Sequence, residues 1–226
     1  MGSLAVALLG MALLAGGPEV PAGQAAPDYC LLMRGAPVSA ETEQLKPVRD
    51  LVAGGDAAGA LAAFRALAAK LEADAERLFF DAEGSDTAPA RAFLDEQVNG
   101  KGGLLVVRGD RFTLRPDIAS YGAFLACRAA DSGFGLALLK GGWRDYADVG
   151  FQTDAVFLMA ALGRWEDADK YLPDGPGGER ESLARGVLAC HGGTVDAGKA
   201  QLSKALETMT DVGARGVARL LLEQCK

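Results

Sequence analysis

One spacing of residues occurs three times along the 226-residue chain. Each copy has a glycine, a small residue five positions later and a large apolar residue nine positions later. The copies are Gly55, Ala60 and Phe64; Gly163, Ala168 and Leu172; and Gly193, Gly198 and Leu202. Glycine permits a tight turn between two helices, and the small residue lets the second helix approach the first closely. The spacing therefore predicts antiparallel helix pairs whose gaps are filled by the large residue.

The apolar composition agrees with a helical protein. The chain has 42 Ala, 31 Leu and 14 Val, whereas Ile118 is its one isoleucine. Alanine and leucine lose little free energy on entering a helix, while strands favour β-branched and aromatic residues. This balance argues strongly against an all-β sandwich or barrel. Moderate charge and enough leucine, phenylalanine and valine for a core argue against disorder.

The stretches around the three glycines resemble the second half of a tetratricopeptide repeat. They read GGDAAGALAAF, LGRWEDADKYLP and GGTVDAGKAQL, and Pro173 lies where that family often has a proline. The resemblance covers residues 47–72 and 151–225. Gly163 and Gly193 are 30 residues apart, whereas the family repeats about every 34 residues, and another segment interrupts the array. The resemblance thus implies a divergent fold of stacked antiparallel helix pairs.

Apolar periodicity predicts helices along most of the chain. They are expected at about 48–52, 57–71, 88–98, 118–129, 153–162, 165–172, 181–189, 196–209 and 211–224, with Asp56 and Thr87 as caps. Short apolar runs around Gly109 and Asp110 predict a β-hairpin insertion at about 103–115. Residues 134–139 are apolar but bounded by glycine, and receive no assignment. Helix 153–162 is apolar nearly all round, so it should be central and buried.

The first 25 residues have the pattern of a secretory signal peptide. An uncharged run from Leu4 to Gly16 is too short to span a membrane but suits a signal-peptide core. Gly23 and Ala25 supply small residues for cleavage before Ala26. A buried N-terminal helix is the alternative. The sequence favours export, either to the periplasm or out of the cell.

The predicted organisation is a signal peptide at 1–25, an irregular lead-in at 26–46 and one helical domain at 47–226. Loss of the signal leaves 29 of the 30 acidic residues and all 23 basic residues, a net charge of −6. This sign argues against nucleic acid or an anionic membrane as a partner, because both attract clustered Lys and Arg. No later stretch is apolar for long enough to span a bilayer. The oligomeric state stays open.

All four cysteines follow the predicted cleavage site: Cys30, Cys127, Cys190 and Cys225. Their even number in an exported chain favours two disulfides over free buried thiols. The helical-repeat resemblance implies the pairing, because it makes helices 181–189 and 211–224 parallel and brings Cys190 and Cys225 to the same end. Cys30 is then left for Cys127. With no CxxC spacing and one histidine, neither a metal nor a cofactor is expected.

Three groups of residues are candidate sites. His191 follows Cys190, but adjacent helical side chains diverge by about 100°, which favours a helix-end position over a nucleophile and base. Arg108, Gly109 and Asp110 match the tripeptide that integrins bind, at a position where the hairpin needs its turn. The acidic group is Asp145, Asp148, Glu166, Asp167 and Asp169. It lacks EF-hand spacing, so a solvated helix face is favoured over calcium or a catalytic carboxylate pair.

Four aromatic residues gather within thirty positions: Trp143, Tyr146, Trp165 and Tyr171. They are candidates for a binding surface, with packing between helices as the alternative. No hydrolase, metalloprotease, phosphate-loop or dinucleotide motif is present, so no catalytic residue is predicted. The leading hypothesis, carried by the resemblance, is an exported protein-interaction module or scaffold in the cell envelope or outside the cell.

Two other classes of function remain. One is a secreted enzyme that uses the carboxylates of Asp145, Asp148, Glu166 and Asp169. The other is a structural subunit of an envelope complex, whose exposed apolar surface a partner or a second copy would cover.

Overall fold

The computed structural model describes residues 27–34, 42–79, 88–109, 111–175 and 177–226. The predicted signal peptide and the candidate cap Thr87 lie outside these ranges. Helices dominate the described residues, and strands β1 (Leu105–Arg108) and β2 (Arg111–Leu114) form the one sheet among them. The predicted mostly α fold class with a small hairpin is therefore confirmed.

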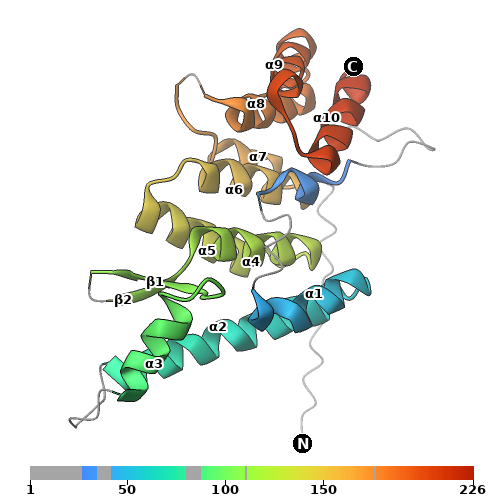
Figure 1. Cartoon of the computed structure of the whole chain (residues 1–226). Coiled ribbons are helices and arrows are strands. Elements are labelled where there is room, and N and C mark those ends of the chain that lie inside the picture. The colour runs from blue at the N-terminus through green and yellow to red at the C-terminus, as the bar shows by residue number, and fades with distance from the viewer. Residues whose placement is uncertain (1–26, 35–41, 80–87, 110, 176) are drawn as a thin grey trace, which may run out of the picture.

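The helices form pairs that stack on one another (Figure 1). Two short 3-10 turns, η1 (Tyr29–Leu32) and η2 (Glu43–Leu45), precede the first pair. The pairs are α1 (Lys46–Ala53) with α2 (Ala57–Phe79), α4 (Pro116–Arg128) with α5 (Ser132–Tyr146), α6 (Gly150–Ala161) with α7 (Trp165–Asp169), and α8 (Glu179–His191) with α9 (Val195–Thr208). Helix α3 (Ala88–Gln97) follows α2, and α10 (Val212–Gln224) packs on α9. Successive pairs meet where α2 contacts α4, α5 contacts α6 and α6 contacts α8.

The three predicted glycine turns share one backbone geometry. Gly55, Gly163 and Gly193 have left-handed φ angles of +80°, +68° and +77°. The amide after each glycine donates to a carbonyl five residues earlier: Asp56 to Leu51, Arg164 to Met159 and Thr194 to Ala189. This hydrogen bond is the usual end of a helix with a left-handed residue. The next helix then begins within two residues of each glycine.

A fourth copy of the turn joins α4 to α5, where the sequence contains no glycine. Ala130 has φ +56° there, and the Asp131 amide donates to the Ala126 carbonyl at 2.8 Å. Gly135 and Leu139 follow at the same intervals as in the other copies. Residues 134–139, which the sequence pattern does not assign, lie within α5 and are helical. The Asp131 carboxylate caps this helix by accepting from the Phe134 amide at 3.0 Å.

Close packing at the small positions explains why the pattern recurs. Ala60 and Ala168 have no exposed surface. A Cβ added at Gly135 would overlap Leu158 of α6, and one added at Gly198 would overlap the Cys190 side chain of α8. The small residue in each copy therefore permits a helix contact that a larger side chain would block.

Helix α6 lies at the centre of the molecule, as its apolar sequence predicts. Residues 153–160 are all buried, including Asp154 with no exposed surface. Its carboxylate accepts from Arg34 Nε at 2.9 Å and from Arg180 at 2.5 Å. A buried charge is tolerated when paired and hydrogen-bonded. The ion pairs hold the N-terminal segment against α6 and α8.

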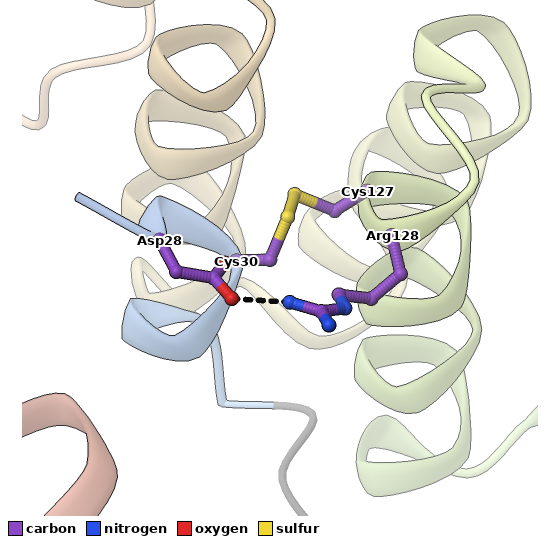
Figure 2. The surroundings of a disulfide bond; sticks show 4 residues. All are labelled: Asp28, Cys30, Cys127 and Arg128. Carbon is purple, nitrogen blue, oxygen red and sulfur yellow. Dashed lines mark hydrogen bonds and ion pairs between the residues drawn. A yellow bond between two sulfur atoms is a disulfide. The ribbon is translucent and has the colours of Figure 1, made fainter. Parts of the chain in front are cut away.

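Both predicted disulfides are present. Figure 2 shows Cys30 of η1 joined to Cys127 of α4 beside an ion pair between Asp28 and Arg128. Cys190 at the end of α8 is joined to Cys225, which follows α10. This is the pairing that the helical-repeat resemblance implies. Two disulfides that use every cysteine of the chain are typical of an oxidising compartment.

Some boundaries differ from the sequence prediction. Helix α7 ends at Asp169, three residues before the expected Leu172, and α8 is longer at both ends. Within the described residues, no helix combines the length and the apolar character that crossing a membrane requires.

Candidate functional site

Helix α5 separates two surface hollows that form the candidate site. The first, called here the interhelical groove, has a volume of about 550 Å³ and lies between α2, the hairpin and α5. Small residues line it on both sides: Ala68 and Ala69 from α2, and Ala137, Gly141 and Gly142 from α5. Because these side chains are short, the two helices leave an open channel between them.

The β-hairpin forms one wall of the groove. β1 and β2 pair antiparallel, with Leu105 opposite Leu114 and Val107 opposite Phe112. The Phe112 ring packs against Phe79 of α2 at 4.8 Å between ring centroids. Aromatic contacts of this kind add to the free energy of apolar burial. The hairpin is thus anchored to α2 on one side.

Tyr146 anchors the hairpin to α5 on the other side. Its hydroxyl donates to the Leu114 carbonyl at 2.7 Å and lies 3.1 Å from the Thr113 hydroxyl. The Arg108 guanidinium lies over its ring, 4.5 Å from the centroid. Tyr146, one of the four candidate aromatics, therefore lines the groove and also holds the hairpin wall in position.

The groove rim carries charges of both signs. Arg65 pairs with Asp131 at 2.6 Å, and Glu72, also on α2, is exposed. At the other end, Asp145 is paired with Arg144 and Arg111. The hydrogen bond from Arg144, opposed by burial and aided by the charges of Arg144 and Arg111, holds the pKa of Asp145 below its usual value. Asp145 therefore stays ionised as a structural partner.

The other candidate carboxylates do not gather into a reactive pair. Burial raises the pKa of Asp148, but hydrogen bonds from Arg34 and the Gly150 amide outweigh it and leave this pKa low. Asp167 accepts from Lys170 and Arg164, which also lowers its pKa. Glu166 and Asp169 are exposed. Among the described residues, no three His, Cys, Asp or Glu side chains are grouped so as to hold a metal ion.

The second hollow, called here the aromatic-basic pocket, has a volume of about 380 Å³ and lies between α5, α6 and the end of α7. Its floor is apolar and consists of Leu139, Phe151 and Ala155, all buried. Trp143 and Tyr171 stand at its sides, and three cations surround it: Lys140, Arg144 and Lys170. Two of the four candidate aromatics therefore share one pocket.

Trp165, the fourth candidate aromatic, serves packing instead. Its ring meets Tyr29 edge-on at 5.5 Å and stacks on His191 at 3.8 Å between centroids. His191 is the last residue of α8, as the helix-end interpretation predicts. Burial lowers the pKa of its imidazole. Because Cys190 is in a disulfide, it offers His191 no thiol to activate.

Arg108 and Gly109 end β1 and begin the hairpin turn, where Gly109 has φ +61°. Asp110 lies outside the described residues. The Arg108 guanidinium is committed to the Tyr146 ring. Two residues of the tripeptide thus have structural roles in the hairpin.

Sequence reasoning missed the small residues of the groove and the three cations of the pocket. The spacing of Ala68, Ala69, Ala137 and Gly141 marks them as helix-face positions, but their meeting depends on how α2 packs relative to α5. Lys140 and Lys170 lie on different helix pairs, and nothing local in the sequence brings them together.

Comparisons with protein families, with curated proteins and with solved structures each found no match to the chain.

Proposed function

We propose that the protein is an exported interaction module that binds a segment of a partner protein in the interhelical groove. One observation carries this proposal: an open groove of about 550 Å³, walled by two helices and a hairpin and lined by small and aromatic side chains. Helical-repeat proteins, which the chain resembles, bind other proteins on such surfaces between stacked helices.

The lining of the groove suits an apolar polypeptide segment. Short side chains at Ala69, Ala137 and Gly141 let a partner backbone approach the helix axes. Phe112 and Phe134 offer apolar area beside them, and Arg65 and Glu72 at the rim supply charges of both signs. An apolar centre with a polar rim is the usual arrangement of a protein interface.

Export is supported by two independent features. The signal-like segment at 1–25 precedes the described residues, and every cysteine is in a disulfide. Disulfides persist in the periplasm and outside the cell, whereas the cytosol keeps thiols reduced. The proposed location of the interaction is therefore the cell envelope or the extracellular space.

Site-specific photo-crosslinking tests the proposal. Benzoylphenylalanine placed at Ala69, an exposed groove position, is expected to form one or two discrete adducts in the native cells. Placed at Ala66, an exposed position of α2 outside the groove, it serves as the matched control. Adducts at both positions alike, or at neither, would contradict a groove-bound partner.

A second variant tests the shape of the groove. Ala137→Arg adds a long charged side chain at an exposed helical position, so it should fill the groove without unfolding α5. We expect it to remove the adducts formed from position 69. Ala66→Arg should leave them unchanged.

No observation favours the two other classes of function over this one. Of the four carboxylates predicted for such an enzyme, Asp145 and Asp148 are each paired with arginine, and Glu166 and Asp169 are exposed. A structural subunit would give an adduct whose mass matches a second copy of the chain or a stoichiometric envelope protein. Loss of that adduct in Ala137→Arg would place such a contact in the groove.

A further inference from the structure

The aromatic-basic pocket lies on the opposite side of α5 from most of the groove, and its chemistry differs. The mature chain is acidic, yet three cations and no carboxylate line this pocket. Its floor of Leu139 and Phe151 is apolar and buried. A concave apolar site with a few convergent charged groups is the usual form of a small-molecule site, and its volume lies in the range of such sites.

Trp143 exposes its ring at the pocket, where a bound molecule can contact it. It is 48% exposed and is the one exposed aromatic ring among the described residues. Tyr171 stands on the same pocket, contributed by the segment after α7. A large exposed ring beside a second ring offers stacking faces for a flat apolar group.

The cations are placed to hold an acid group beside those rings. Lys140 Nζ lies 5.7 Å from the Tyr171 ring centroid and has no ion pair among the described residues. Lys170 pairs with Asp167 in a largely exposed ion pair. Exposed pairs contribute little free energy, so a bound anion can compete for Lys170. Arg144 is held by the buried carboxylate of Asp145 and adds positive charge at the edge of the pocket.

We propose that the aromatic-basic pocket binds a small organic anion: a flat apolar body stacked on Trp143, with a carboxylate, phosphate or sulfonate held by Lys140 and Lys170. Arg144 lines both this pocket and the groove, but Lys140, Lys170 and Trp143 line the pocket alone, so the proposal does not depend on the partner of the groove. Apolar burial supplies part of the affinity, and the charge selects anions over neutral compounds of the same shape.

Two probes of the same shape test this assignment. One is 8-anilinonaphthalene-1-sulfonate, and the other is N-phenyl-1-naphthylamine, which lacks the sulfonate. The disulfide-bonded protein is titrated with each probe in a Trp165→Phe variant, where Trp143 is the one remaining tryptophan. The sulfonate should bind at one saturable site and quench Trp143, about tenfold more tightly than the neutral probe, as one charge-assisted contact provides.

Substitutions locate the probe. These variants are read by the fluorescence of the probe itself. Lys140→Glu should weaken sulfonate binding at least about tenfold, and Trp143→Ala should remove the saturable rise in probe fluorescence. Lys204→Glu, an equal charge change at an exposed lysine of α9, should leave binding unchanged. Lys140 and Trp143 are exposed, so unchanged circular dichroism and melting should accompany both losses.

Three results would overturn the proposal: equal affinity for both probes, unchanged affinity for the sulfonate in Lys140→Glu, or loss of sulfonate binding in Ala137→Arg but in neither pocket variant. The last would place the probe in the groove. Crosslinking from position 69 tests the groove independently of the two probes. Failure of one proposal therefore leaves the other to be decided by its own experiment.

Discussion

His191 shows how burial shifts the titration of a residue. The imidazole lies nearly parallel to the Trp165 indole, at an interplanar angle of 11°, and burial lowers its pKa. An unfolded histidine titrates near its ordinary value of about 6.5. Between the folded pKa and that value the unfolded chain binds more protons than the folded one. Acidification through this window therefore reduces stability.

We predict that the His191 ring titrates below its ordinary pKa, and that Trp165→Leu moves the pKa back up because it uncovers the ring. A proton NMR titration measures this directly, since the chain has one histidine. Trp143→Leu, at the tryptophan that does not stack on His191, is the control and should leave the pKa unchanged. In urea unfolding, His191→Gln should lose less stability than the wild type when the pH falls through the window. An equal loss in both proteins would contradict the linkage.

At the scale of the helix pair, the position five residues after the turn limits how closely two helices approach. In the α8–α9 pair this residue is Gly198, and an added Cβ would lie 2.9 Å from the Cys190 amide nitrogen and close to both sulfurs of its disulfide. The large residue of the same copy, Leu202, packs against Gly186 of α8. The α8–α9 pair therefore depends on matched small and large residues across its contact.

Gly198→Ala should destabilise the protein by about 1–3 kcal/mol, because the overpacked helices must move apart. The matched control is Gly216→Ala in α10, where an added Cβ has open space and the residue is exposed. That change should stabilise by about 0.5–1 kcal/mol, because alanine loses less conformational entropy in a helix. Urea unfolding of both variants measures the difference. A Gly198→Ala variant as stable as Gly216→Ala would show that the approach of α8 and α9 is not limiting.

The turns also show what sequence could and could not predict. The turns at Gly55, Gly163 and Gly193 could be predicted because glycine adopts a left-handed φ at little cost. The turn at Ala130 could not be predicted, because alanine adopts that conformation only where surrounding packing imposes it, at a cost of roughly 1 kcal/mol. At the site, Trp143 and Tyr171 stood out as rare residues. Their cationic neighbours did not, since charged residues on helices are ordinarily solvated.

For the whole molecule, the two disulfides close loops of very different length. Cys30 and Cys127 are 97 residues apart, whereas Cys190 and Cys225 are 35 apart. The first bond ties η1 to the middle of the stack, and the second ties α8 to the end of α10. In the chain-entropy account, the longer loop restricts the unfolded state more.

Replacing Cys30 and Cys127 by serine should therefore destabilise the protein by about 1 kcal/mol more than replacing Cys190 and Cys225, with each loss between roughly 2 and 5 kcal/mol. The ion pair between Arg34 and Asp154 should keep η1 docked in the first variant. Equilibrium urea unfolding of both double variants measures the two losses. A larger loss from the second pair would mean that native contacts at the C-terminal end outweigh loop entropy.

The order of the cysteines has a consequence for how an exported chain is oxidised. The first cysteine pairs with the second and the third with the fourth. A chain that crosses the membrane N-terminus first exposes its thiols in the same order. Each bond can then close as soon as its second thiol arrives, without a wrong partner waiting on the exported side. If the chain is exported as proposed, sequential oxidation by a thiol oxidase would lead to the native connectivity with no need for disulfide reshuffling.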